Sequence, residues 1–142
     1  MKKVVLLLFS LFLFSCGASS TKTAGTNALY EVLTQQADGG ATIRFFEILS
    51  TEKEIAMLLN DEQLKNKIKT SDIQTSNFIV LNLGEKISAG YKIEIENAVE
   101  TDKNIIITIK ETETQSASTA VQEITTPFSV VKINSKKEII IK

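Results

Sequence analysis

The side chains that most often carry catalysis or hold metals are almost absent from this chain. Its 142 residues contain no histidine and a single cysteine, Cys16. Without imidazole groups, and with one thiol, the chain lacks the ligands of zinc, copper and haem sites. Histidine-dependent triads are excluded for the same reason. A carboxylate pair or a Ser-Lys dyad stays possible in principle. We expect no enzyme, no cofactor and no metal site.

Cys16 lies where its thiol can carry a lipid. A short positive segment, Met1 to Lys3, precedes an apolar run from Val4 to Phe14. As a helix this run would rise about 16 Å, half of a ~30 Å hydrocarbon core, which suits a cleavable export signal rather than a membrane span. It ends in Leu-Phe-Ser-Cys, which resembles the bacterial lipobox, whose cysteine is alkylated by a diacylglycerol before cleavage. Residues 1–15 are therefore predicted to be a lipoprotein signal peptide, and Cys16 the lipid-attachment site.

The residues that follow Cys16 predict how the chain is held in the envelope. Two or three acyl chains would make the anchor stable where one would be marginal. Residues 17–22 contain no acidic side chain, so acidic inner-membrane retention and surface-export signals are both missing. We expect an outer-membrane anchor that faces the periplasm. Residues 16–28 are predicted to be a flexible tether, because they offer no large apolar side chain to bury.

Residues 84–91 form a second stretch whose composition suggests a function. The sequence Gly-Glu-Lys-Ile-Ser-Ala-Gly-Tyr lies between two apolar segments. A polar loop tip with one apolar side chain can contact a protein partner, while glycines and an aromatic side chain hold its shape. The residues expected to touch a partner are Lys86, Ile87 and Ser88. The residues expected to shape the loop are Gly84, Gly90 and Tyr91. The alternative interpretation is a plain connection between strands.

The elements that must position this loop are mostly strands. Two runs rich in β-branched and aromatic residues, 29–36 and 42–49, flank Asp38-Gly39-Gly40 and predict a β-hairpin. The capping-box pattern of Thr51 and Glu54 predicts a helical segment over 51–67. Further strands are predicted at 78–83, 91–96, 105–111, 121–125, 128–133 and 138–141.

The order ββαβββββ predicts an α+β fold. We expect a mostly antiparallel β-sheet, or a small barrel or sandwich, of about seven strands with one helical segment. After the signal peptide and the tether, residues 29–142 have the length of one domain. The 16 basic and 17 acidic residues nearly balance and form no basic stripe. Nucleic acid is therefore not an expected partner.

Three stretches resemble the PrcB family, which is named for a lipoprotein subunit of a bacterial protease complex. The first is 84–91, where the family typically has Gly-Glu-Lys-Pro-Thr-Gly-Gly-Tyr after an apolar strand. The others are 107–112 and 121–133, the latter with a Thr-Pro-Phe step. The resemblance covers roughly residues 30 to 134, and its core is 78–133. This chain departs from the family pattern at Ile87, Ser88 and Ala89, where Pro, Thr and Gly are usual.

The resemblance implies a protein-associated role without naming the partner. We expect a non-catalytic envelope lipoprotein that associates with a protease and can stabilise or modulate it. Two alternatives stay open. One is a direct protease inhibitor that acts through the 84–91 loop, and the other is a small-ligand carrier with a pocket between helix and sheet.

Overall fold

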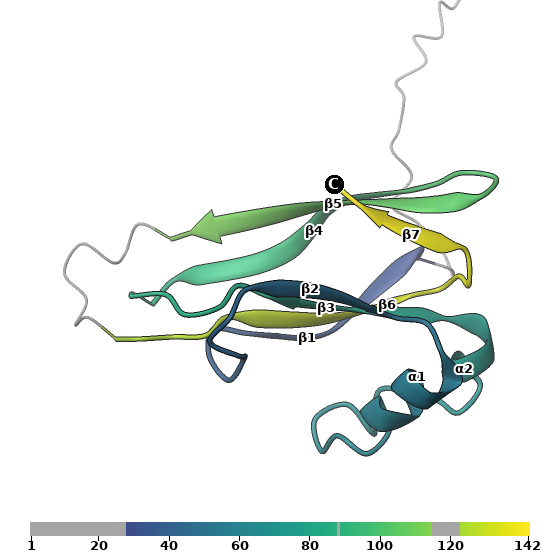
Figure 1. The fold of residues 1–142 in the computed structure, drawn as a ribbon, viewed down its shortest axis with the longest axis horizontal. Helices are drawn as coiled ribbons and strands as arrows, with labels where there is room; N and C mark the ends of the chain where they lie inside the picture. The colour runs from purple at the N-terminus through teal and green to yellow at the C-terminus, as the bar shows by residue number, and fades with distance from the viewer. Residues whose placement is uncertain (1–27, 88, 115–122) are drawn as a thin grey trace, which may run out of the picture.

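The most buried strands of the described residues lie at the centre of the first sheet. β3 (Asn77–Asn82) pairs antiparallel with β6 (Phe128–Ile133). β1 (Tyr30–Gln36) and β2 (Phe45–Leu49) flank this pair, and the strand order is β1-β6-β3-β2. The computed structural model describes residues 28–87, 89–114 and 123–142, and Figure 1 shows their arrangement.

A second sheet of three strands covers one face of the first. β4 (Tyr91–Glu100) and β5 (Asn104–Glu113) form a long antiparallel hairpin, and β7 (Glu138–Ile141) pairs parallel with β5. The order in this sheet is β4-β5-β7. In Figure 1 the two sheets lie one above the other, so the chain forms a sandwich and not a closed barrel.

The core lies between the two sheets because alternate side chains of each strand point inward. Ile79 and Leu81 of β3 meet Ile93 of β4 and Ile105 and Ile107 of β5, and all are buried. Burial of each such aliphatic side chain contributes about 1.5–3 kcal/mol. Because successive side chains point to opposite faces of a strand, burial of the apolar set determines which residues face the opposite sheet.

Two short helices cover the other face of the four-stranded sheet. α1 (Glu52–Leu58) begins at a capping box, in which the amide of Glu54 donates to Thr51 Oγ1 and the carboxylate of Glu54 accepts from the amide of Thr51. α2 (Asp72–Thr75) follows a series of turns. A second core cluster joins this layer to the sheet through Ile55, Leu64, Ile68, Phe78 and Val130. No helix within the described ranges is long and apolar enough to cross a membrane.

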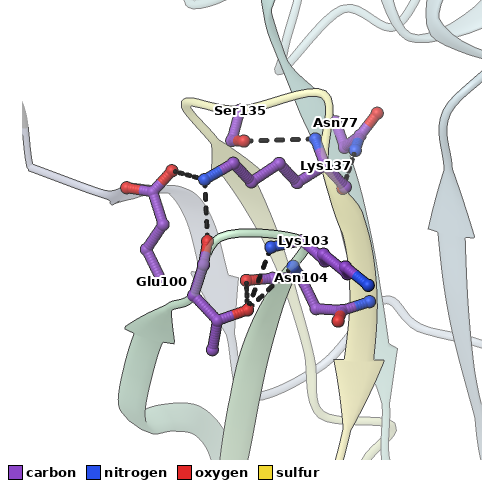
Figure 2. Close-up of polar contacts among 7 residues, drawn as sticks. Asn77, Glu100, Lys103, Asn104, Ser135 and Lys137 are labelled. Atoms are coloured by element: carbon purple, nitrogen blue, oxygen red, sulfur yellow. Dashed lines mark hydrogen bonds and ion pairs between the residues drawn. The ribbon is translucent and has the colours of Figure 1, made fainter.

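The connection from β6 to β7 carries the chain from one sheet to the other and is held by Lys137 (Figure 2). Its Nζ donates to the carboxylate of Glu100 at 2.9 Å and to the carbonyl of Thr101 at 2.7 Å. Its own carbonyl accepts from Nδ2 of Asn77 at 3.0 Å. The side chain of Thr101 also accepts the amide of Asn104 at 2.9 Å. One lysine thus joins β3, the β4–β5 turn and the start of β7.

The predicted α+β class with mostly antiparallel strands is confirmed, but three predicted elements are corrected. The β-hairpin of 29–36 and 42–49 is wrong, because β1 and β2 lie on opposite edges of one sheet. The helical segment 51–67 is too long, because α1 ends at Leu58 and α2 was not predicted. At 121–125, the described part holds one bridge, between Thr125 and Lys86, and no strand.

The early end of α1 follows from Asp61. Its carboxylate accepts the amide of Gln63 at 2.8 Å and the amide of Leu64 at 3.2 Å. An aspartate that binds backbone amides two and three residues ahead offers the chain a turn in place of a continuing helix. Leu64 and Ile68 still pack against the sheet. Their helical spacing therefore indicated buried positions correctly, although the segment is not a helix.

Candidate functional site

One end of the sandwich is built from three connections that are hydrogen-bonded to one another. They are residues 37–44, 84–90 and 123–127, and we call this end the tip, at the left in Figure 1. The ladder of β3 and β6 continues into it, since the amide of Leu83 donates to the carbonyl of Pro127 at 3.0 Å. Beyond that point Lys86 and Thr125 exchange two backbone hydrogen bonds of 2.8 and 2.9 Å. The tip is therefore an extension of the two central strands.

Residues 37–44 cross the ends of both central strands on the way from β1 to β2. The amide of Gly40 donates to the carbonyl of Thr126 at 2.9 Å, and the amide of Glu85 donates to the carbonyl of Thr42 at 3.0 Å. A Cβ atom on Gly40 would lie 2.1 Å from Oδ1 of Asn82. The glycine pair thus allows a close crossing and not the hairpin turn predicted from the sequence.

Asn82 holds this crossing from inside the protein. Its buried side chain accepts the amide of Ala41 at 2.9 Å and donates to the carbonyls of Ala41 and Ile43 at 2.9 and 2.7 Å. The sequence interpretation treated Asn82 as part of an apolar strand and missed this role. The sequence did contain a signal for this role, namely an asparagine in an apolar strand, because a buried polar side chain needs hydrogen-bond partners.

Asp38 fastens the same crossing to the start of β6. Its carboxylate accepts the side-chain hydroxyl of Thr126 at 2.8 Å and the amide of Thr126 at 3.0 Å. These bonds, the side-chain bond first, lower the pKa of Asp38 below its ordinary value. Hydrogen bonds to the charged form favour that form, so the carboxylate is the state that stabilises the tip.

Of the residues predicted to shape the loop, the two glycines have positive φ angles and the tyrosine packs against the core. Gly84 has a φ of +74°, and a Cβ atom there would lie 2.8 Å from the amide nitrogen of Arg44. Gly90 has a φ of +105°, and its carbonyl accepts the amide and the hydroxyl of Thr114 at 3.0 and 2.8 Å. Tyr91 is half-buried against the core between the sheets. Both glycines therefore lie where a side chain would strain the backbone.

The three residues predicted to touch a partner differ in their surroundings. Ile87 is 71% exposed. Lys86 is half-buried, and its Nζ lies 5.1 Å from the centre of the Tyr91 ring, a cation–π contact. Ser88 lies outside the described residues, as does the predicted lipid-attachment residue Cys16. Of these positions, Ile87 presents the largest described apolar side chain at the tip.

Two further exposed isoleucines lie at the tip and were not predicted as contact residues. Ile124 is 62% exposed and Ile43 is 76% exposed. Ile87 and Ile124 are the chain neighbours of Lys86 and Thr125, so the bridge between those two residues brings the two isoleucines onto adjacent segments. The sequence interpretation placed Ile43 and Ile124 in regular strands, where alternation explained them. Their presence at the same end of the sandwich depends on pairing between distant segments.

The opposite end of the sandwich, the base, includes the β4–β5 turn, residues 134–137 and Ala28. An open pocket of about 580 Å³ lies there, between α2 and the ends of β4 and β6. Lys132 lines it, with Nζ 3.2 Å from the carboxylate of Glu31 and 3.6 Å from that of Asp72. The charges at this pocket therefore bind one another. Within the described ranges, no group of three or more metal-ligating side chains could hold an ion.

The comparisons with known proteins identify the central part of the chain. Residues 77–134 match the family model described as PrcB C-terminal. This range begins at β3, ends just after β6 and includes the 84–90 connection of the tip. The searches of curated proteins and of solved structures found no match. The resemblance inferred from the sequence is confirmed, since residues 77–134 match the PrcB family.

Proposed function

We propose that this chain is a non-catalytic protein-binding module, lipid-anchored in the cell envelope through Cys16, that associates with a protease complex through its tip. The PrcB C-terminal match supports the association with a protease complex. The anchor rests on the sequence of residues 1–22.

The observation that carries this proposal is the exposed pair of Ile87 and Ile124. Both side chains lie on backbone that is fixed by the two hydrogen bonds between Lys86 and Thr125. Contiguous exposed apolar side chains mark interaction surfaces on soluble proteins. A surface that is already ordered loses little conformational entropy when it binds, so more of the contact energy remains as affinity.

The direction of β1 supports the use of the tip as the binding end. Tyr30, the first residue of β1, pairs with Ile133 at the base, whereas Gln36 pairs with Phe128 beside the tip. At about 3.3 Å per residue, β1 spans about 20 Å between the two ends. A tether that precedes Ala28 therefore joins the domain at the base. An anchored chain would present its tip away from the lipid.

The construction of the tip favours an accessory subunit over a direct inhibitor. The 84–90 connection is bonded to 37–44 through Glu85 and to 123–127 through Lys86. At Glu85 and Lys86 the connection is therefore part of a surface shared with 37–44 and 123–127. A broad apolar surface suits docking on a protein face, whereas insertion into a catalytic cleft needs a narrow projection.

The test compares two exposed apolar pairs on one protein. In a tagged form of residues 17–142, the double variant Ile87→Ser and Ile124→Ser changes the tip. Val99→Ser with Ile140→Ser changes two other exposed apolar side chains, which lie on the outer face of the second sheet. We expect the wild type and the second variant to retain the same protease-complex component from envelope extract, with binding by the tip variant at least tenfold weaker, about 1.4 kcal/mol.

Equal binding by the tip variant and the wild type would refute the role of the tip. The peptidase activity of the bound complex then decides between the two protease-linked functions. Activity that is unchanged or raised when the purified chain is added fits an accessory subunit. A dose-dependent loss of activity that the tip variant no longer causes would identify a direct inhibitor.

A small-ligand carrier is a second candidate because the pocket at the base lies between α2 and the sheet. Its volume of about 580 Å³ falls within the usual range for small-molecule sites, roughly 300–1,000 Å³. Its lining is mainly polar, which suits a polar ligand such as an amino acid or a sugar. A thermal-shift screen with these compounds should raise Tm for at least one. No shift for any compound would argue against the carrier function.

A further inference from the structure

The strand β5 is longer than the strand that covers its outer edge. β7 pairs with β5 from Asn104 to Ile107, and Lys142 adds one bond to each of Ile107 and Ile109. β5 continues for residues 110–113 beyond this point, as Figure 1 shows at the left of the second sheet. We call residues 110–113 the open edge of β5. At about 3.3 Å per residue it is about 13 Å long.

The direction of the backbone groups along the open edge follows from the pairing with β4. The amide of Thr114 donates to the carbonyl of Gly90, so even-numbered residues in this part of β5 point their backbone groups at β4. In an antiparallel strand these directions alternate. Glu111 and Glu113 therefore point theirs outward. Among residues 28–87, 89–114 and 123–142, no hydrogen bond to the outward groups of either residue is found.

Other strand edges of the sandwich carry features that block pairing. β1 has an irregularity between Val32 and Thr34, and the ammonium of Lys67 donates to the carbonyl of Leu33. On β4, the register shifts after Ile95, and the side chain of Gln35 donates to the carbonyl of Ile93 at 2.8 Å. Bulges and covering side chains are common means of protecting edges. The register of β5 with β4 is regular over residues 110–113.

The inner side of the open edge offers both an apolar contact and negative charge. Ile109 and Phe46 pack against the core between the sheets and stay partly exposed. The guanidinium of Arg44 lies 4.5 Å from the centre of the Phe46 ring and binds the carboxylate of Glu111. Glu113 is exposed two residues further along. A strand added here would meet an apolar surface at one end and acidic side chains at the other.

The charges also decide between a second copy of this chain and a different protein. In an antiparallel pair made through the same edge of two copies, outward-pointing residues face one another. Glu111 would then lie opposite Glu111 or Glu113 of the other copy. Like charges directly opposite one another are destabilising. A strand with a basic residue at that position would instead gain from the pairing.

We propose that the open edge of β5, residues 110–113, binds an extended segment of a partner protein as an added strand, with a lysine or arginine of that segment facing Glu111 and Glu113. Main-chain hydrogen bonds would supply affinity, and alternate side chains would supply specificity. The proposal rests on the protein-binding function proposed above and assigns a second surface to it. The tip and the open edge contain different residues, so each can be tested separately.

The first experiment measures amide hydrogen exchange by NMR on residues 17–142. The amides of Lys110 and Thr112 should exchange slowly because they bond to β4. Those of Glu111 and Glu113 should exchange at least a hundredfold faster, because they face solvent. Equal protection of all four amides would mean that the edge is already occupied, which would overturn the proposal.

The second experiment selects binders from a phage-displayed library of random twelve-residue peptides. Glu111→Pro removes the outward amide and no bond to β4, since proline is tolerated at strand edges. Glu111→Ala is the matched control, because it removes the carboxylate and keeps the amide. Selected peptides should carry lysine or arginine and lack proline. They should bind Glu111→Pro at least tenfold more weakly than wild type, and Glu111→Ala at most about threefold more weakly.

Each remaining outcome has a defined meaning. Peptides that bind Glu111→Pro and wild type equally, or a library that yields no peptide, would overturn the added-strand proposal. If Glu111→Pro does not fold, the selected peptides must instead slow exchange of the Glu111 and Glu113 amides in the wild type, and failure to do so overturns it. The Ile87→Ser and Ile124→Ser variant should bind these peptides normally. The open edge can thus fail while the tip is upheld, or the reverse.

Discussion

The two ends of the sandwich satisfy their backbone groups by different means. At the base, lysine side chains donate to carbonyls: Lys136 binds those of Ser50 and Ser76, and Lys137 binds that of Thr101. At the tip, most of the corresponding bonds come from the neutral side chain of Asn82, and no lysine side chain of the described residues takes part; the carboxylate of Asp38 adds a bond to the amide of Thr126. The base therefore distributes its bonds over several solvated cations. The tip concentrates them in one buried amide.

This difference also decides what each end exposes. Lysine stems and their charged ends cover the base with groups that are already hydrated or paired. The tip holds its backbone with the buried amide of Asn82 and with one carboxylate, that of Asp38, and its isoleucines point outward from this framework. A rigid apolar surface is suited to contact with another protein, whereas a charged surface with internal partners is suited to solvent. We expect the strongest mutational effects on stability at Asn82 and the weakest at exposed charged groups.

The largest expected effect is that of Asn82→Ala. It removes the three hydrogen bonds that this buried side chain makes to the amide of Ala41 and to the carbonyls of Ala41 and Ile43, so the free energy of unfolding should fall by about 3 kcal/mol. Urea denaturation of residues 17–142 measures it. Asn66→Ala, at an exposed position, should change stability by less than about 0.5 kcal/mol. A loss below about 1 kcal/mol for Asn82→Ala would remove the contrast between the ends.

Gly84→Ala should follow, with a loss of about 2 kcal/mol. The new Cβ atom combines a positive φ with distances of 2.8 and 2.9 Å to backbone atoms of Arg44 and Thr42. Gly39→Ala is the control, because its φ is also positive but its nearest contact is 3.4 Å. Thermal unfolding of both variants separates the cost of a positive φ from the cost of the steric clash. Equal losses would mean that close approach at the tip contributes nothing.

Lys137→Met should cost about 1 kcal/mol, less than either change at the tip. The variant loses the bond to the carbonyl of Thr101, while its ion pair with Glu100 is partly exposed and contributes little in water. The exposed residue Lys103 gives a control, Lys103→Met, which should be neutral. If Lys137→Met lowers stability more than Asn82→Ala, the base depends on a single side chain as well. The comparison would then have to be reversed.

The smallest effect concerns the pH dependence of stability, which involves two carboxylates: Asp38 at the tip and Glu54 in the first turn of α1. The pKa of Asp38 is lowered by Thr126, and that of Glu54 is lowered by the amide of Thr51. A lowered folded-state pKa contributes stability above the unfolded value and loses it as pH falls through the folded value. Melting temperatures of Asp38→Asn and wild type should therefore converge below about pH 4. A difference that grows on acidification would show that protonated Asp38 is the stabilising form.

The sequence predicted local elements well where an apolar run lies next to turn residues. β6 and β7 have the predicted bounds, because Phe128–Ile133 and Glu138–Ile141 combine apolar character with nearby turn residues. The helix start at Thr51 was predicted because a capping box is local. The end of α1 was not, because Asp61 replaces helical bonds with its own carboxylate. Local sequence patterns thus predict strands and helix starts better than they predict helix ends.

Contacts between distant segments account for the features that were missed. Asp38-Gly39-Gly40 has the composition of a hairpin turn, and only the bonds from Asn82 and Thr126 show that it is a crossing. Ile87 was predicted as a contact residue from its own loop. Ile124 was not, because it is placed beside Ile87 by the bridge between Lys86 and Thr125. The contribution of Ile124 to the apolar surface could therefore not be predicted without the pairing of the two segments.

The antiparallel pairing of β1 with β6 has a mechanical consequence. If the chain is anchored before Tyr30 and its partner holds the tip, a pull between them runs along both strands in opposite directions. Hydrogen bonds in an antiparallel pair lie across the strands, so such a load stretches the bonds from Tyr30 to Gln36 together rather than one at a time. A pull applied across the sheet would instead open the same bonds in sequence. The fold is thus arranged to resist shear along the line that joins a membrane to a bound partner.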